Sequence, residues 1–270
     1  MSIFENYLTE ETMEFRIRNE DKFQYVEEGE GPILLLLHGL FGALSNWGPA
    51  LDHFSKKYKV VIPLMPLFVM PLSDTNVDGL SDFIHEFITF KQYPPVTLLG
   101  NSLGGHVALV YVLDHPENVN ALVLTGSSGL YENSMGGTYP KRQDYNYIKT
   151  RTEYTFYDPN IATKDLVDEV YEIVNSRTKG LRIIAMAKSA IRYNMSKELK
   201  NIHIPVCLIW GRDDKITPSE VADEFHSLLP NSELNFIEQC GHAPMMERPE
   251  EFNALLDNFL AKQIIPANFH

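Results

Sequence analysis

Eight short stretches of the chain have the composition of β-strands. Several are continuous runs of β-branched and other apolar residues, the pattern of strands in a parallel sheet that is covered on both faces. The stretches lie at residues 14–18, 23–27, 32–37, 59–63, 96–100, 121–126, 205–210 and 233–238. This pattern predicts an eight-stranded, mostly parallel sheet.

Segments with helical periodicity occupy much of the chain between these strands. They lie at residues 47–56, 79–92, 103–114, 217–229 and 249–262. Thr217, Pro218 and Glu220 predict the start of the fourth segment, because they combine an N-cap, a proline in the first turn and a capping-box glutamate. Strands that alternate with helices predict an α/β fold with helices on both faces of the sheet.

One connection is much longer than a crossover between strands requires. It leaves 78 residues between Gly126 and Pro205, and segments 163–176 and 178–195 within it have a helical pattern. We therefore predict an inserted helical lid. The expected parts of the chain are the first part of the α/β core at residues 1–126, the lid at 127–200 and the second part of the core at 201–270.

Charge distinguishes the predicted lid from the rest of the chain. The whole sequence has a formal net charge of −13, whereas residues 127–200 hold 12 Lys and Arg against 9 Asp and Glu. The overall negative charge argues against nucleic acid or an anionic membrane as the main partner, because both attract clustered basic residues. We interpret the basic lid as docking on an acidic core, in preference to steering a substrate.

Several features bear on compartment and partners. The start of the chain lacks the basic and apolar regions of a secretory signal, and no apolar run reaches the roughly 18 residues of a spanning helix. The two cysteines, Cys207 and Cys240, are far from a C-x-x-C spacing. We expect a cytoplasmic protein without metal or cofactor that acts on a small-molecule substrate as a monomer or homodimer.

The stretch LLGNSLGGH, residues 98–106, places Ser102 between a predicted strand and a predicted helix. In a G-x-S-x-G turn the serine sits in a strained conformation, and here Gly100 and Gly104 would let strand and helix approach each other. The alternative is a glycine-rich turn that binds phosphate. That site favours G-x-G-x-x-G or G-K-[ST], and neither pattern is present. Ser102 is therefore a candidate nucleophile.

A serine hydroxyl needs a base within hydrogen-bond reach to become a nucleophile. His242 is the best candidate, because it lies in QCGHAPMMERP, directly after the last predicted strand. We interpret His38 and His106 as structural. The loop WGRDDKITP, which follows the strand at 205–210, supplies an acid, and both Asp213 and Asp214 remain candidates.

Taken together, these motifs resemble those of the lidded α/β-hydrolases. They occur in that family's order, with HG at 38–39, GNSLGG at 100–105, WGRDD at 210–214 and CGH at 240–242. The resemblance implies that the acid is the last residue of W-G-x-x-D, here Asp214. It also implies an oxyanion hole formed by the backbone N–H groups of Leu40 and Leu103.

The expected chemistry is that of a serine hydrolase. His242 would remove the proton of Ser102 as it attacks a carbonyl, and Asp214 would fix the imidazole tautomer and stabilise its cation. An acyl-enzyme would form and be released by water. A serine at this turn disfavours dehalogenase and epoxide-hydrolase chemistry, whose relatives in this fold have aspartate there. Cys240 is interpreted as a packing residue.

One loop departs from the family's pattern. Relatives usually have an aspartate and a glycine-rich D-x-x-G-x-G-x-S turn after the fourth strand, whereas this chain has LMPLFVMPLSD at 64–74. We predict that Leu67, Phe68 and Met70 pack against the lid and form part of an apolar acyl pocket. The alternative is that these side chains fill the core or bury a dimer contact.

The sequence specifies the substrate less closely than it specifies the catalytic residues. The serine motif, the stretch SNW at 45–47 with Asn46 as a candidate pocket residue, and GSSGLYE at 126–132 look like the branch that cleaves carbon–carbon bonds in ring-fission products. That branch has arginine and tryptophan on a lid helix, where this chain has Val170 and Tyr171. We therefore favour an esterase for small or medium apolar acyl groups. A carbon–carbon bond hydrolase acting on dienoates and a ligand receptor on a hydrolase scaffold remain alternatives.

Overall fold

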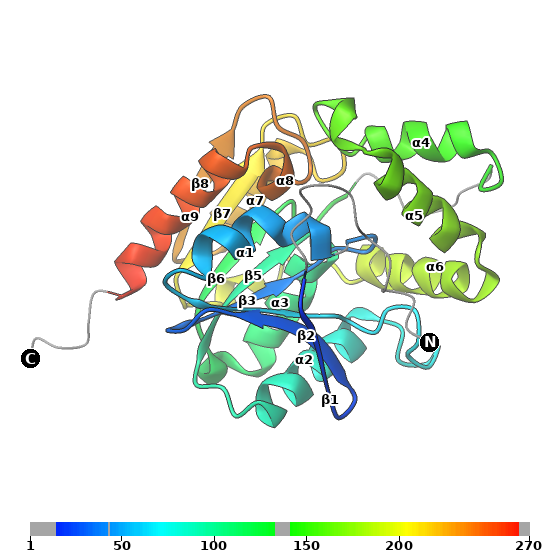
Figure 1. Ribbon diagram of the computed structural model, residues 1–270. Helices are drawn as coiled ribbons and strands as arrows, with labels where there is room; N and C mark the ends of the chain where they lie inside the picture. Colours follow the sequence, from blue (N-terminus) through cyan, green and yellow to red (C-terminus); the bar gives the residue numbers. More distant parts are fainter. Residues whose placement is uncertain (1–14, 43, 133–140, 265–270) are drawn as a thin grey trace, which may run out of the picture.

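A computed structural model describes residues 15–42, 44–132 and 141–264 of the chain (Figure 1). Its centre is one eight-stranded sheet, in the order β1-β2-β4-β3-β5-β6-β7-β8. The strands are β1 (Ile17–Glu20), β2 (Phe23–Glu28), β3 (Ile33–Leu37), β4 (Lys59–Pro63), β5 (Val96–Asn101), β6 (Val119–Thr125), β7 (Val206–Gly211) and β8 (Ser232–Ile237). The eight predicted strands are thus confirmed. The first begins later than expected, and position 14 lies outside the described residues.

The sheet is mostly parallel, as predicted. The pairs β1–β2 and β2–β4 are antiparallel, and every pairing from β4 across to β8 is parallel. The strands β3 and β7, which both have a neighbour on each side, are buried along their whole length. Burial on both faces explains why these strands are continuously apolar rather than alternating in the sequence.

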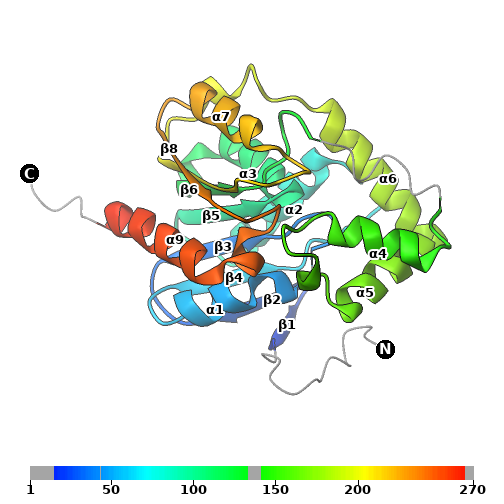
Figure 2. The same ribbon diagram turned by 90° about the horizontal axis from the view of Figure 1, so that it is seen from above.

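Two layers of helices cover the sheet, and successive residues of a strand face different layers (Figure 2). In β3, Leu35 and Leu37 belong to the core on one face, whereas Leu34 and Leu36 belong to the core on the other. The first core contains residues of α2 (Val77–Phe90), α3 (Leu103–Asp114) and α7 (Ser219–Leu228). The second contains residues of α1 (Gly48–Phe54), α8 (Pro244–Glu247) and α9 (Pro249–Ile264).

Three further described α-helices follow β6 and precede β7 in the sequence, and they lie beside one end of the sheet (Figures 1 and 2). We call α4 (Tyr145–Glu153), α5 (Lys164–Asn175) and α6 (Arg177–Arg192) the inserted helices. Helices α5 and α6 correspond to the predicted segments 163–176 and 178–195. Helix α4 is absent from the prediction, because its sequence YNYIKTRTE is mostly polar and only Ile148 and Thr152 are buried.

The predicted start of α7 is wrong. The helix begins at Ser219 with Pro218 as its N-cap residue, and no side chain caps it. Thr217, the expected cap, instead donates its hydroxyl to Asp214 across 2.8 Å.

Among the helices that the structure describes, none combines the length and the apolar character that crossing a membrane requires.

Candidate active site

Ser102 occupies a sharp turn between the end of β5 and the start of α3. Its backbone has a φ of 55° and a ψ of −120°, a combination that is costly for a residue with a side chain. Glycine is required on both sides of the serine. A Cβ atom at Gly100 would lie 2.4 Å from the carbonyl oxygen of Gly104, and one at Gly104 would lie 2.1 Å from that of Leu37.

Backbone hydrogen bonds hold this turn against the end of β6. The N–H of Ser102 donates to the carbonyl of Thr125 at 3.1 Å, and its own carbonyl accepts from Ser128 N–H at 3.1 Å. These contacts compensate for the unfavourable dihedral angles. The serine is consequently fixed at the carboxyl edge of the sheet, where ligands bind in open α/β sheets.

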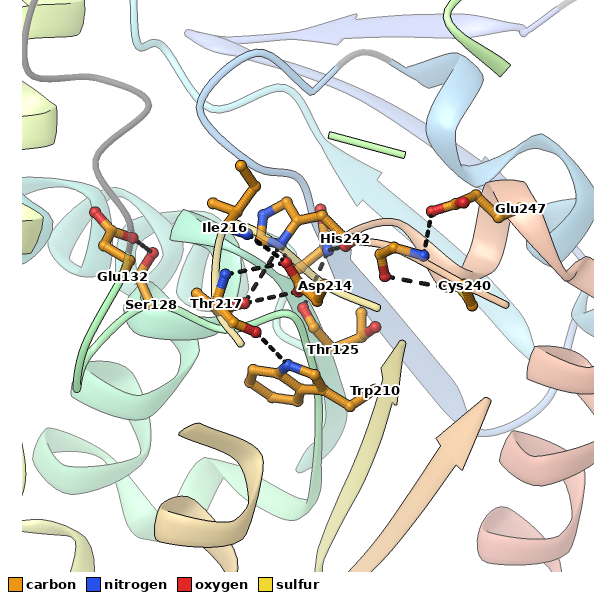
Figure 3. A network of polar contacts seen from close by, with 12 residues as sticks. Thr125, Ser128, Glu132, Trp210, Asp214, Ile216, Thr217, Cys240, His242 and Glu247 are labelled. Carbon is orange, nitrogen blue, oxygen red and sulfur yellow. Dashed lines mark hydrogen bonds and ion pairs between the residues drawn. The ribbon is translucent and has the colours of Figure 1, made fainter. Parts of the chain in front are cut away.

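Asp214 and His242 form a buried pair near this edge, in the loops after β7 and β8 (Figure 3). The distance from His242 Nδ1 to Asp214 Oδ2 is 2.8 Å. The other oxygen of Asp214 accepts the backbone N–H groups of Ile216 at 2.8 Å and Thr217 at 3.0 Å. Asp213 is exposed, so the structure distinguishes between two aspartates that the residue pattern alone leaves open.

The environment of His242 has opposing effects on its pKa. Burial, the largest single influence, lowers the pKa, while the charge and hydrogen bond of Asp214 raise it, and the carboxylates of Glu132 and Glu247 raise it further. The balance lies above the ordinary value for histidine. A higher pKa makes the imidazole a stronger base, provided that it is neutral at the working pH.

His38 and His106, the two histidines that we interpret as structural from the sequence, lie in surroundings that agree with this interpretation. Burial lowers the pKa of His38, so its ring is neutral; Nδ1 lies 2.9 Å from Gly39 O, and Nε2 accepts from Met65 N–H at 3.3 Å. This side chain ties the turn after β3 to the loop after β4. His106 is fully buried, and burial lowers its pKa to about 4. Neither residue is among the described residues that line the cavity with Ser102.

A family model described as serine aminopeptidase, S33, matches residues 69–249 of the chain. This chain is an α/β-hydrolase of that family. A metagenomic α/β-hydrolase from lagoon sediments of Mar Chica, Morocco, is 44% identical, with a TM-score of 0.77, and the match covers 92% of this chain and 99% of that one. The resemblance inferred from the motifs is therefore confirmed at the level of the family.

Curated relatives of this α/β-hydrolase have different substrates in their names. Bovine monoacylglycerol lipase ABHD6 (Bos taurus) is 27% identical over 276 residues, 91% of this chain and 81% of the relative. A 2-hydroxy-6-oxo-6-(2'-aminophenyl)hexa-2,4-dienoic acid hydrolase of Metapseudomonas resinovorans is 29% identical over 263 residues, 89% of this chain and 88% of the relative. Similarity of this kind supports hydrolase activity but does not specify the bond that is cleaved.

The hydrolase has a cavity in which the candidate residues meet. Ser102 and His242 both line it, as do the predicted oxyanion residues Leu40 and Leu103 and the predicted pocket residue Asn46. The inserted helices and their connections supply much of the remaining wall, including Thr152, Phe156, Leu166, Val170, Met186 and Ala190. Most of these side chains are apolar, and they include Val170, the position at which we expect arginine in the carbon–carbon hydrolase branch.

Leu67, Phe68 and Met70, predicted to pack against the lid and to form part of the acyl pocket, are not among the described residues that line this cavity. Leu67 and Met70 are buried in the core beside α2, and Phe68 packs against the same core. The loop turns back on itself, since the N–H of Met70 donates to the carbonyl of Pro66 at 3.0 Å. It does contact an inserted helix, because Arg182 Nε donates to Met70 O at 2.9 Å. Leu67 and Met70 thus fill the core, as in the alternative, whereas Phe68 is partly buried and also contacts an inserted helix, because Lys179 Nζ of α6 lies 5.3 Å from the centre of its ring.

Two residues that support the Asp214–His242 pair were not predicted from the sequence. Thr217 Oγ donates to Asp214 Oδ2 at 2.8 Å. Asn101 Nδ2 donates to the carbonyl of Thr125 at 3.0 Å and to that of His242 at 3.1 Å, which fastens the serine turn to the histidine loop. The available signals were the position of Asn101 immediately before the serine and a threonine three residues after the acid.

Cys240 is fully buried, and burial raises the pKa of its thiol. A thiol with a raised pKa is mostly protonated at neutral pH and is a weak nucleophile. This agrees with its interpretation as a packing residue.

The backbone next to Cys240 is held by Glu247, which accepts the N–H groups of Gly241 at 2.9 Å and Tyr157 at 2.8 Å. The histidine loop is thereby bonded to the inserted segment.

Proposed function

We propose that this α/β-hydrolase cleaves carboxylic esters with small or medium apolar acyl groups through an acyl-enzyme on Ser102. The observation that carries the proposal is the cavity around Ser102 and His242, whose wall is mainly aliphatic and aromatic. Among the described residues, no lysine or arginine lines it. A neutral, apolar acyl chain fits such a wall, because burying it costs no unpaired charge.

The positions of the polar groups support the proposed reaction. Asp214 accepts the Nδ1 proton of His242, so Nε2 carries the lone pair that takes the hydroxyl proton of Ser102. The serine oxygen then bonds to the ester carbonyl carbon, and the backbone N–H groups of Leu40 and Leu103 stabilise the oxyanion.

Collapse of this intermediate breaks the ester bond. The imidazolium of His242 gives its proton to the departing alcohol, and the acyl group stays on Ser102. Water then attacks the acyl-enzyme with the same imidazole as base, and the carboxylic acid leaves. Thr217 and Asn101 act on this cycle as positioning residues, because one holds Asp214 and the other holds the histidine loop.

The same cavity disfavours a dienoate as the substrate. A ring-fission dienoate carries a carboxylate, which would need a cationic partner once it is removed from water. Arg177 is exposed, and Arg182 donates to the carbonyls of Met70 and Thr178. These two arginines are the candidates for the role of the lid arginine in the carbon–carbon hydrolase branch, and neither of them lines the cavity. The name of the bovine relative, a monoacylglycerol lipase, agrees with an ester substrate.

A substrate panel tests the proposal. p-Nitrophenyl esters from acetate to decanoate are compared with a ring-fission dienoate, using the wild type, Ser102→Ala and Cys240→Ala. We expect ester hydrolysis that Ser102→Ala lowers by about 10⁴-fold or more and that Cys240→Ala retains. Thermal melting checks that each variant is folded. A folded Ser102→Ala protein that keeps its activity, or a dienoate that is strongly preferred to every ester, would contradict the proposal.

A further inference from the structure

The mainly apolar cavity contains one carboxylate that the proposed reaction does not use. Glu132 lies in the segment after β6 and lines the cavity together with Ser102 and His242. Ser128, which also lines the cavity, donates its hydroxyl to Glu132 Oε2 across 2.5 Å (Figure 3). This hydrogen bond fixes the direction of the carboxylate, so the group occupies a defined place in the wall.

The negative charge of Glu132 is not compensated by a basic residue nearby. Within residues 15–42, 44–132 and 141–264, no lysine or arginine forms an ion pair with it. A carboxylate has about four acceptor positions. Its hydrogen bond from Ser128 uses one of them, and no other described donor is bonded to it. As far as the described residues go, acceptor capacity and negative charge therefore remain available to a molecule in the cavity.

A fixed carboxylate in an apolar wall discriminates strongly between substrates. A hydroxyl or ammonium group beside it gains a charge-assisted hydrogen bond, which is stronger than a bond between neutral groups. A substrate carboxylate at the same place meets a like charge in a partly buried position, where screening by water is weaker than in bulk solvent. Sites built around a buried polar group reject analogues that leave this group unpaired.

We propose that Glu132 is a specificity-determining residue that selects esters with a hydrogen-bond donor, either hydroxyl or ammonium, and rejects esters with a carboxylate. The selected group lies on the alcohol or acyl arm that reaches Glu132 while the ester carbonyl lies at Ser102. This inference rests on the proposed function, because it assumes that an ester reacts at Ser102. It adds to that function a polar subsite within an otherwise apolar pocket.

Pairs of esters with nearly the same shape test the inference on the alcohol arm. 2-Hydroxyethyl butyrate is compared with propyl butyrate, and protonated 2-(dimethylamino)ethyl butyrate with 3-methylbutyl butyrate. On the acyl arm, methyl 6-hydroxyhexanoate is compared with methyl heptanoate, and monomethyl adipate with methyl 6-methylheptanoate. For the wild type we expect kcat/KM to favour the donor by about tenfold on one arm, and to disfavour the carboxylate by about tenfold.

Two substitutions separate the charge of Glu132 from its hydrogen bond. Glu132→Gln keeps an oxygen that can accept from Ser128 but removes the charge, so the rejection of monomethyl adipate and the preference for ammonium should fall to within about twofold. Glu132→Leu removes both, so the preference for hydroxyl should also be lost. Glu172→Gln is the control, because it removes a negative charge from an exposed position on α5 that does not line the cavity.

A pH profile gives a second readout that a merely structural role would not move. The charge of Glu132 contributes to the raised pKa of His242, so the acidic limb of kcat/KM for propyl butyrate should move to lower pH in Glu132→Gln and stay in place in Glu172→Gln.

The outcomes distinguish this inference from the proposed function. If the wild type hydrolyses propyl butyrate but does not discriminate within any pair, the specificity role of Glu132 is overturned and the esterase function stands. Discrimination that survives in folded Glu132→Gln and Glu132→Leu also overturns it. If no ester is hydrolysed, or hydrolysis survives Ser102→Ala, the proposed function itself fails.

Discussion

Replacement of Asp214 by asparagine should disable the histidine through its tautomer. The carboxylate oxygen Oδ1 accepts two backbone N–H groups, from Ile216 and Thr217, so an oxygen has to remain at that position. The amide nitrogen of the asparagine then occupies the place of Oδ2, which lies 2.8 Å from His242 Nδ1. An N–H donor at that position requires Nδ1 to be the acceptor, and the ring proton moves to Nε2, where the serine needs a base.

The expected loss follows from this change. A substitution of this kind, which keeps the geometry but imposes the wrong tautomer, lowers kcat by about 10⁴-fold, or about 5 kcal/mol of transition-state stabilisation. The protein should still fold, because all three hydrogen bonds from Ile216 and Thr217 can be kept or reversed. Asp213→Asn is the matched control. Asp213 is exposed, and its backbone N–H donates to Cys240 O at 2.9 Å, a bond that the substitution keeps, so we expect less than about a twofold change.

The assay is kcat/KM for p-nitrophenyl butyrate, with circular dichroism and thermal melting of each variant. The residual activity of Asp214→Asn should also have its acidic limb at lower pH, because the charge that raises the pKa of His242 is gone. The reasoning is refuted if Asp214→Asn retains more than about a tenth of the activity, or if Asp213→Asn has the larger effect.

Three further predictions follow from the same contacts. Thr217→Val removes the hydroxyl that donates to Asp214 and should lower kcat/KM by about tenfold with KM little changed, as steady-state kinetics would measure. Because the pKa of His242 is raised and its neutral form is the base, activity should fall as the pH drops through a midpoint above the usual value of about 6.5; a midpoint below that value would contradict the assignment. Phe68→Ala should lower stability by about 1–3 kcal/mol in urea unfolding and leave the acyl chain-length profile unchanged, since Phe68 packs against the core and not the cavity.

The sheet and most helices could be predicted because their burial is reflected in the pattern of apolar residues within each element. A strand such as Ile33–Leu37 is covered on both faces and is apolar throughout, so its sequence reveals it without reference to any neighbour. Helix α4 has no comparable pattern. Its residues are mostly polar, and Asp144 fixes its start by accepting the N–H of Tyr147.

The site was predictable where the backbone imposes a residue type. The turn at Ser102 requires glycine on both sides, and that requirement is visible as a motif. Thr217 was misread because a threonine before proline satisfies the pattern of a helix cap as well as that of a partner for Asp214, and only the fold decides between them. Glu132 is the last residue of the stretch GSSGLYE, but the residue pattern does not show that its carboxylate lines the cavity, since its place there depends on the path of the segment after β6.

The direction of the loop at 64–72 could not be read from its composition. An apolar loop at the ligand-binding edge can turn toward the cavity or toward the core, and both outcomes bury Leu67 and Met70. Long-range contacts that the composition does not reveal, such as the hydrogen bond from Arg182 Nε to Met70 O, hold the loop in its observed position. A pattern of apolar residues indicates that a surface is covered, but not by what.

Direct detection of the acyl group on the enzyme tests the central claim most plainly. The protein is mixed with p-nitrophenyl butyrate, quenched in acid within the first turnover and analysed by intact mass and peptide mapping. We expect one butyryl group, located on Ser102, that is absent from Ser102→Ala and accumulates more slowly in Asp214→Asn than in Asp213→Asn. A butyryl group on another residue, or hydrolysis that proceeds in Ser102→Ala without any adduct, would contradict it.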